Sequence, residues 1–422
     1  MTDEREAVKR LDELVEWINC DRSSRAVAPA GWDEVAWTTA RTRLPSRVDE
    51  LTERRSHEKG VAWAWAASDL GRRRLCCAVE EGVVVGLSVR PPEDVRPWAA
   101  IAPTGFTGDE SVGAAAVEFA RASEVPGCVV GKAGDGERAI AACGYSDLAD
   151  LEPMLPSSVF RLSSVTKVLT TIATLRLVRD GELALETPIA NVLDIPAADK
   201  VTVQHLLTHT SGLKFDGWVH VAEGEPELCI EDCTITHAAP PGTKRLYANQ
   251  GFALLGRAIE RCTGQPWVAH IQQTILEPLG TTRTVLSDPP GFPDGFVDEG
   301  DAIVPEDRYT PGYGPAAAGW TTARDLLVIG QALVDPDRGL VDHKMLSLIN
   351  HSYVNVDGKI TQGLGLLRFT ANGGDVLFHS GGWPGWSAAL AVRVRDRAVA
   401  VVGANRSVDA RFDWPLMLLG SE

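Results

Sequence analysis

The hydrophobic pattern of the first hundred residues changes from helical spacing to short continuous runs. A helix is predicted over 3–19, where the apolar residues recur every three or four positions: Val8, Leu11, Leu14, Val15 and Ile18. Two shorter helices are expected next, over 31–43 and 46–57. The apolar runs that follow predict three strands, at 61–68, 73–80 and 83–90, before prolines end the series. We therefore predict a small α+β module over residues 1–105, whose role the pattern leaves open.

In the rest of the chain, strand-like runs stand at both ends and helical spacing lies between them. After a helix predicted over 112–123, two apolar runs are joined by Gly134-Asp135-Gly136, which predicts a hairpin of strands at 127–132 and 137–143. From Phe160 to about residue 350 the spacing is mainly helical. Strands return at 375–379, 387–394 and 398–404. This order predicts an α+β domain over 106–422, in which the two ends close an antiparallel sheet and the helical segment lies across one face.

Composition narrows the class of protein. A chain of 422 residues with 44% hydrophobic and 23% charged residues is typical of a soluble globular protein with two or three domains. The formal charge of −16 argues against a nucleic-acid partner, which needs a concentrated basic surface. We find no apolar stretch long enough to cross a membrane. The charged first twenty residues lack the apolar core of a secretion signal, so a cytoplasmic location is expected.

Neither a metal nor a cofactor is expected. The eight cysteines do not form a disulfide-scaffold pattern. Cys229 and Cys233 stand one helical turn apart and could bind a metal, but no second Cys or His pair accompanies them, so reduced thiols are the preferred interpretation. The glycine patterns of nucleotide-binding loops and the Gly-x-Ser-x-Gly elbow are missing from the sequence.

A Ser-x-x-Lys motif occurs at Ser164-Val165-Thr166-Lys167. On a helix, side chains at this spacing lie roughly 5–6 Å apart at Cβ. A serine hydroxyl is a poor nucleophile until a neighbour removes its proton. Lysine can do so only when burial or nearby positive charge lowers its pKa from about 10.4. Ser164 is therefore the candidate nucleophile and Lys167 its candidate base.

The residues behind Ser164 distinguish this match from two others. They predict a helix, with Gly181 placed to end it and with an apolar stripe: Val165, Val168, Leu169, Ile172, Leu175 and Val178. The other matches lack such a helix, because Ser56…Lys59 lies in a charged run and Gly212 interrupts Ser211…Lys214. On spacing alone, an ordinary helix N-terminus remains the alternative interpretation.

Five segments carry a wider resemblance: FRLSSVTK at 160–167, LLTHTSGL at 206–213, PGTKRLYAN at 241–249, AGWTTARDL at 318–326 and FHSGG at 378–382. In this order they are similar to segments of the serine β-lactamase and penicillin-binding-protein superfamily, and above all of class C β-lactamases and their esterase and transacylase relatives. The resemblance leaves the N-terminal module out. It implies an antiparallel sheet flanked by helices, a mainly helical subdomain over about 170–370, and an active site between them.

The resemblance also implies roles for single residues. Ser164 would attack a carbonyl after Lys167 and Tyr247 remove its proton, and Asn249 would orient Lys167 and hold the substrate. The amides of Ser164 and Gly382 would stabilise the oxyanion, while Gly381 would let the substrate approach the strand. Two tryptophans follow, Trp383 and Trp386, which could form an aromatic wall or pack in the core. His209 is expected to support its loop, and Thr322 and Asp325 to begin a helix.

One departure from the family pattern bears on the substrate. His379 stands where family members often carry a lysine. Histidine is largely neutral at pH 7, whereas lysine is a permanent cation suited to the carboxylate of β-lactams. Histidine at this position is common among the esterase-like relatives, which shifts the expectation away from β-lactam hydrolysis.

We therefore expect a serine enzyme that transfers an acyl group through an acyl-enzyme. A cytoplasmic esterase or transacylase that acts on a small ester, thioester or amide, for example in natural-product biosynthesis, comes first. A D-amino-acid amidase or peptidase comes second and a β-lactamase third. A binding protein that keeps the fold without catalysis is the alternative of another class. The expected partners are a small acyl donor and an acyl acceptor, while the oligomeric state is left open.

Overall fold

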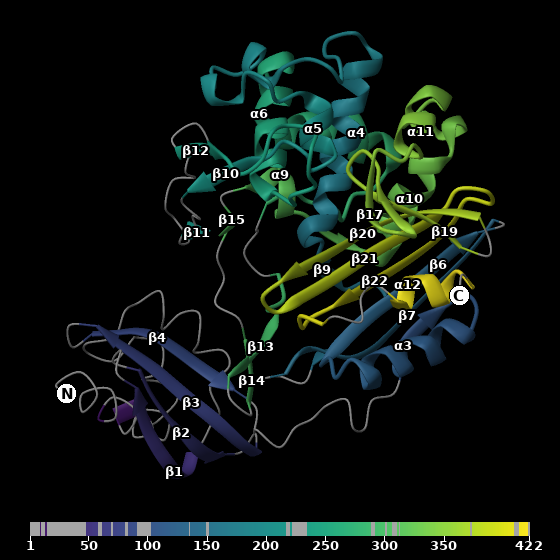
Figure 1. The fold of residues 1–422 in the computed structure, drawn as a ribbon. Coiled ribbons are helices and arrows are strands. Elements are labelled where there is room, and N and C mark those ends of the chain that lie inside the picture. The colour runs from purple at the N-terminus through teal and green to yellow at the C-terminus, as the bar shows by residue number, and fades with distance from the viewer. Residues whose placement is uncertain are drawn as a thin grey trace. The chain divides into compact units, whose positions relative to one another are not determined.

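The structure of the chain is a computed structural model (Figure 1). It describes residues 9, 13–14, 48–57, 61–68, 71–80, 83–90, 103–134, 136–148, 152–216, 220–221, 234–287, 292–299, 302–305, 310–311, 313–371, 374–408 and 413–420. The chain divides into two compact units. One comprises Met1–Arg96, Asp147–Glu152 and Asp298–Val304, and the other comprises Pro97–Ser146, Pro153–Val297 and Pro305–Glu422.

The first unit contains a four-stranded antiparallel sheet in the order β1-β2-β3-β4. The strands are β1 (Val48–His57), β2 (Val61–Ser68), β3 (Gly71–Glu80) and β4 (Val83–Arg90). The three strands predicted here are confirmed. The helix predicted over 46–57 is wrong, because residues 48–57 form a strand that pairs with β2, as in the Thr52–Trp65 and Arg55–Trp63 partners. Pairing with a neighbouring strand has overridden the helical preference of its Glu and Arg residues.

The helices predicted over 3–19 and 31–43, and the pair Cys229 and Cys233, fall in parts of the chain where the structure describes few residues or none. Residues 9, 13 and 14 are helical, as predicted for 3–19. The rest of that helix, the helix over 31–43, and Cys229 with Cys233 lie outside the described residues.

The second unit is built on a ten-stranded antiparallel sheet. Nine strands follow the order β17-β18-β19-β20-β21-β22-β6-β7-β5, with β8 as the tenth. The pairing of β22 with β6, for instance Val402 with Val130, joins the two ends of the unit as predicted. The strands are β5 (Pro103–Thr107), β6 (Gly127–Gly134), β7 (Glu137–Asp147), β8 (Glu152–Pro153), β17 (Val354–Asp357), β18 (Ile360–Gln362), β19 (Leu367–Ala371), β20 (Gly374–Trp383), β21 (Trp386–Arg393) and β22 (Ala398–Ala404).

Helices cover both faces of this sheet (Figure 1). On one face lie α3 (Ser111–Ala122) and α12 (Asp413–Leu418), whose Phe119 and Trp414 share a core with Val130 of β6. On the other face lies α10 (Ala323–Val334), whose Leu327 shares the main core with Val129. Because successive residues of a strand point to opposite faces, Val129 and Val130 serve the two cores.

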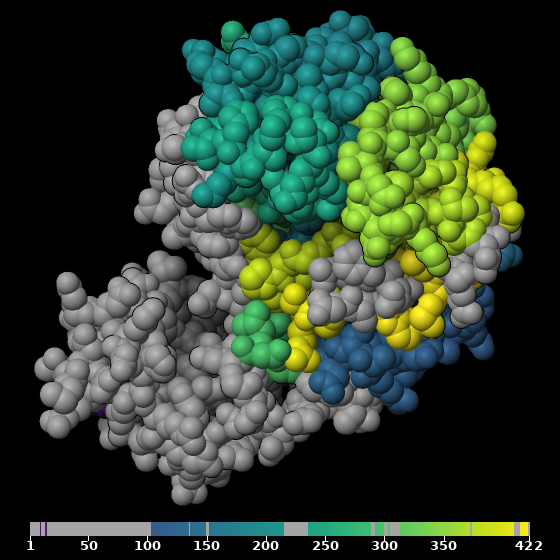
Figure 2. Space-filling view, in the orientation of Figure 1, coloured from purple at the N-terminus to yellow at the C-terminus, as the bar shows by residue number. Residues whose placement is uncertain are grey.

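Most of the remaining elements form the helical side of the second unit, seen in teal and green above the yellow strands in Figure 2. The prediction of helices between the strands is confirmed, but β17, β18 and β19 within 354–371 were not foreseen, since that stretch is too short and mixed to show a strand period. These elements are α4 (Thr166–Arg179), α5 (Val203–Leu207), α6 (Asn249–Thr263), α7 (Trp267–Ile271), a π-helical turn (Gln272–Leu276), α8 (Glu277–Leu279), α9 (Gly314–Ala317), α11 (His343–Ile349), and the short strands β10 (Leu213–Asp216), β11 (His220–Val221), β12 (Thr234–His237) and β15 (Thr310–Pro311). Two further strand pairs are β9 (Val159–Arg161) with β16 (Trp320–Thr322), and β13 (Phe296–Glu299) with β14 (Ala302–Pro305), of which Asp298–Val304 belongs to the first unit.

None of the helices in the described part of the chain combines the length and the apolar character that crossing a membrane requires.

Asn405, directly after β22, reinforces the junction between the two ends of the sheet. Its side chain is fully buried. The Gly127 N–H donates to Asn405 Oδ1 at 2.8 Å, and Asn405 Nδ2 donates to the Tyr145 carbonyl at 2.8 Å. One side chain therefore satisfies a backbone donor of β6 and a backbone acceptor of β7.

We predict that Asn405→Ala lowers the free energy of unfolding by about 2–4 kcal/mol, because it leaves a buried N–H and a partly buried carbonyl without partners. Urea denaturation followed by circular dichroism measures the change. Lys344→Ala, at an exposed position in α11, is the matched control and should change stability by less than about 0.5 kcal/mol. Equal stability of the two variants would contradict the assigned role of Asn405.

Candidate active site

Ser164 lies in a single 3₁₀ turn, Ser163–Val165, that leads directly into α4. The sequence placed it at the start of the helix, and the structure places it in this turn, just before Thr166. Ser163 has a φ of 48°, in the left-handed region that non-glycine residues rarely adopt. Such strain persists only where surrounding structure holds it. The turn therefore presents the half-buried Ser164 in one defined orientation.

Strand β20 lies against this turn at Gly381. A Cβ atom at Gly381 would come within 2.1 Å of the Leu162 carbonyl oxygen and 3.1 Å of the Ser164 nitrogen. Only glycine allows so close an approach. The backbone of β20 is thus adjacent to the Ser164 amide, the arrangement that two backbone donors to one oxyanion require.

Lys167 is fully buried in the first turn of α4. Its Nζ donates to Asn249 Oδ1 at 2.8 Å and to the Ala316 carbonyl at 3.0 Å. Burial lowers the pKa of Lys167 well below its ordinary value, which favours the neutral amine. A neutral amine has two hydrogens for these two acceptors and keeps a lone pair. The arrangement can therefore accept a proton.

Tyr247 lies beside this amine, with Lys167 Nζ 4.9 Å from the centre of its ring. The Tyr247 ring stacks on His209, with ring centres 4.3 Å apart and an interplanar angle of 30°. His209 also accepts a hydrogen bond from the Ala248 N–H at Nδ1 (3.3 Å) and from the Leu246 N–H at its carbonyl (2.8 Å). Burial, and then the charge of Lys167, lower the pKa of His209 well below its usual range. A neutral His209 thus positions the Tyr247 segment, in keeping with the supporting role expected for it.

A pocket of about 360 Å³ opens at Ser164. It brings together five of the residues predicted from the sequence, and Lys167 lies beneath it, hydrogen-bonded to Asn249. The residues that line it are Ser164, His209, Arg245, Tyr247, Asn249, Gln362, Leu367, His379, Ser380 and Gly382.

Two predicted residues have other places. Trp383 is buried against Arg161, whose Cζ lies 4.7 Å from its ring centre, and Trp386 packs on Trp320 with ring centres 5.1 Å apart. Neither tryptophan lines the pocket. Both pack in the core, and they do not form the aromatic wall that was the other expectation. Trp383 lies on the same face of β20 as His379 and Gly381, and it joins the main core at the end of the strand.

His379 lines the pocket and is neutral at pH 7. Burial, and then the charge of Lys167, lower the pKa of His379 to about 3. Its Nδ1 donates to the Ser380 carbonyl at 2.7 Å, so that Nε2 is the acceptor nitrogen of the ring. At neutral pH, β20 therefore presents no cation at this position.

Arg245 and Gln362 line the pocket but were not singled out from the sequence. Arg245 Nε donates to Gln362 Oε1 at 2.9 Å. Arg245 stands two residues before Tyr247, and in an extended segment such residues face the same side, which was a usable signal. Gln362 gave none, because it lies in β18, within a stretch too short and mixed to show a strand period.

Comparison with known proteins extends these observations. The model of the family described as Beta-lactamase matches residues 114–422. Penicillin-binding protein 4 of Amycolatopsis lactamdurans is 34% identical over 170 residues, which are 38% of this chain and 45% of the relative. Esterase EstB of Burkholderia gladioli is 34% identical over 164 residues, which are 33% of this chain and 41% of the relative. The chain thus spans less than half the length of these two curated relatives.

A solved structure shows the same fold. The D-amino acid amidase of Ochrobactrum anthropi SV3, complexed with L-phenylalanine amide, superposes with a TM-score of 0.64 at 22% identity, over 74% of this chain and 98% of the amidase. This likeness establishes the antiparallel sheet with flanking helices, as the sequence predicted.

We predict that Asn249→Asp moves the acid limb of the reactivity of Ser164 to higher pH. A carboxylate beside Nζ favours the ammonium form, so the pKa of Lys167 rises and the free amine is lost at a higher pH as the solution is acidified. The rate at which a fluorophosphonate labels the protein, measured against pH, should show a limb shifted upward by about one unit or more. An unshifted limb would mean that Lys167 does not limit the reaction.

Proposed function

Because the chain belongs to the beta-lactamase family, we propose that it is a serine hydrolase that cleaves a small ester through an acyl-enzyme on Ser164. The observation that carries the proposal is the buried Lys167, which is held by Asn249 and Ala316 next to the nucleophile turn and has no acidic partner among the described residues. A buried amine of this kind is costly to keep in a fold, and it has the low pKa that a general base needs near neutral pH.

The first step follows from this geometry. The lone pair of Lys167, with the Tyr247 hydroxyl as relay, removes the proton of Ser164 as its Oγ attacks the ester carbonyl. The carbonyl oxygen becomes an oxyanion, and the backbone N–H groups of Ser164 and Gly382 are the donors proposed to stabilise it. The close approach of Gly381 to the turn supports this pairing.

The second step releases the product. The alkoxide leaving group takes the proton through Tyr247 as the C–O bond breaks, and Ser164 holds the acyl group. Water, deprotonated by the same amine, then attacks the acyl-enzyme and frees the acid. A small alcohol or amine in place of water would make the product of a transacylase, which is the same chemistry with another acceptor.

The charges that line the pocket separate the candidate substrates. Its described lining contains no Asp or Glu, and Arg245 contributes a positive charge. A free ammonium group, such as that of a D-amino acid amide, would find no counter-ion there. This observation favours an ester over an amino acid amide.

Labelling tests the nucleophile against its neighbour. We expect a fluorophosphonate to add one adduct to the wild-type protein and none to Ser164→Ala, by intact mass with peptide mapping. Ser163→Ala is the matched control, since Ser163 is fully buried in the same turn, and it should keep the adduct. An adduct that persists in Ser164→Ala, or no adduct on the folded wild type, would make the chain a binding protein or place the nucleophile elsewhere.

Lys167→Met tests the base. Methionine matches the buried stem of lysine but cannot accept a proton, so kcat for 4-nitrophenyl butyrate should fall about 10²- to 10⁴-fold while the circular dichroism spectrum is kept. Wild-type turnover in this variant would remove Lys167 from the mechanism.

A further inference from the structure

Arg245 is held in a fixed orientation at the wall of the pocket. Its Nε donates to Gln362 Oε1 at 2.9 Å. The amide of Gln362 is itself held, because its Nε2 donates to the carbonyls of Gly363 and Leu366 at 3.0 Å each. These two bonds turn Oε1 toward Arg245, and Gln362 is almost fully buried. The guanidinium therefore stands on a rigid support and does not behave as a mobile surface cation.

The described residues offer Arg245 no counter-ion. None of the ion pairs among them involves Arg245, and the described residues that line the pocket include no carboxylate. Its side chain is half-buried, and burial lowers the pKa of Arg245 from its usual value. A partly desolvated cation without an anion is unfavourable, and an anionic ligand would relieve that cost.

Arg245 is also the residue of the described pocket lining that carries a permanent charge. The pKa of His379 is lowered to about 3 and that of His209 well below its usual range, so both are neutral at pH 7. Lys167 favours its neutral form and donates its two hydrogens to Asn249 Oδ1 and the Ala316 carbonyl. The chain as a whole has a formal charge of −16. Among the described residues that line the pocket, Arg245 alone is positively charged at pH 7.

From this juxtaposition we infer that Arg245, oriented by Gln362, binds a carboxylate of the substrate, and that the enzyme acts on esters which carry a carboxylate in the same molecule. The terminal nitrogens of a guanidinium present parallel N–H donors that match the two oxygens of a carboxylate. The inference rests on the proposed function and names its substrate class. Gln362 is a positioning residue in this account.

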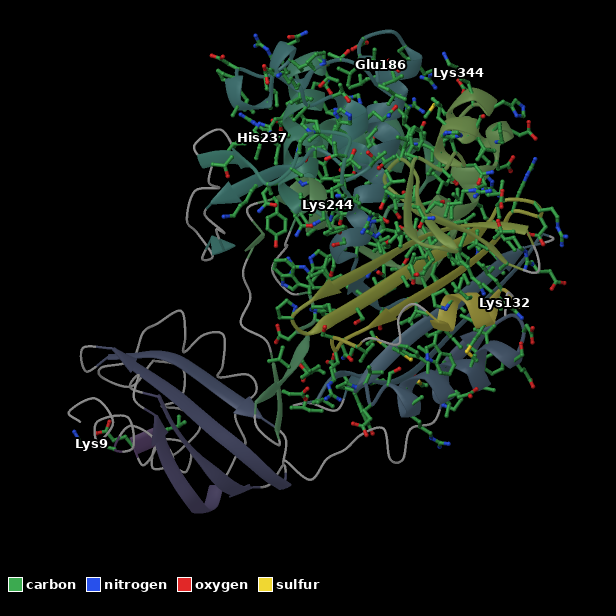
Figure 3. The ribbon with its side chains drawn as sticks, viewed as in Figure 1. Lys9, Lys132, Glu186, His237, Lys244 and Lys344 are labelled. Carbon is green, nitrogen blue, oxygen red and sulfur yellow. The ribbon has the colours of Figure 1, made fainter. Side chains whose placement is uncertain are left out.

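Matched ester pairs test the inference. In one pair the acyl half carries the charge: mono-4-nitrophenyl glutarate against its neutral methyl ester. In the other the leaving group carries it: 4-carboxyphenyl butyrate against 4-(methoxycarbonyl)phenyl butyrate. The variants are Arg245→Gln, which keeps a donor but loses the charge, and Lys244→Gln. Lys244, labelled in Figure 3, is the exposed neighbour of Arg245 and does not line the pocket.

We expect the wild type to prefer the charged member of at least one pair, mainly through a lower KM. In Arg245→Gln, kcat/KM for that member should fall roughly 10- to 100-fold more than for its neutral partner, the usual effect of a lost charge-assisted hydrogen bond. Lys244→Gln should behave like the wild type on both members. If Arg245→Gln lowers both members of each pair equally, Arg245 is a structural support and the inference is overturned.

A binding measurement separates this failure from a failure of the proposed function. Calorimetric titration of the Ser164→Ala variant with monomethyl glutarate needs no turnover, and dimethyl glutarate is its neutral control. Saturable binding of the acid that Arg245→Gln removes supports the anion site even if no ester is cleaved. Turnover of neutral esters with no preference for carboxylates in either assay leaves the hydrolase standing and rejects the substrate class.

Discussion

The burial of one amine organises the catalytic half of this protein. Lys167 can be enclosed only because Asn249 at the start of α6 and Ala316 in α9 supply acceptors for its two hydrogens. The same junction is reinforced one turn along α4, where Thr170 Oγ1 donates to the Pro315 carbonyl at 2.7 Å. The packing of α4, α6 and α9 therefore sets the protonation state of the base. The positions of these three helices are therefore required for the chemistry of Lys167 as well as for the fold.

Local sequence patterns predicted those parts of the fold that depend on residues close together in the chain. The helix behind Ser164, the hairpin of β6 and β7 and the C-terminal strands all show strong periods or turn residues, and the structure contains them. The site residues with chemical signatures, Ser164, Lys167, Tyr247, Asn249 and His379, surround or underlie one pocket. Their catalytic roles still rest on the experiments proposed above.

What the sequence did not reveal depends on partners distant along the chain. Segment 46–57 has the composition of a helix, yet its residues 48–57 pair with β2 as a strand. Gln362 is part of the site because it accepts a hydrogen bond from Arg245, which lies 117 residues away in the chain. No local sequence pattern could predict this contact. Trp383 stands next to the glycines of the site, but it is buried in the main core and packs against Arg161. Each miss reflects tertiary pairing that outweighs local preference.

The closure of the sheet by β22 and β6 has a consequence for how the protein is made. Gly127 and Asn405, which are hydrogen-bonded across this junction, are 278 residues apart. On the ribosome, β6 and the nucleophile helix therefore emerge long before the strand that completes their layer. Contacts of such high sequence separation make folding slow, and the waiting edge of β6 is open to pairing with other nascent chains. Yield in a foreign host will thus depend on chaperone capacity during the interval in which this edge is exposed.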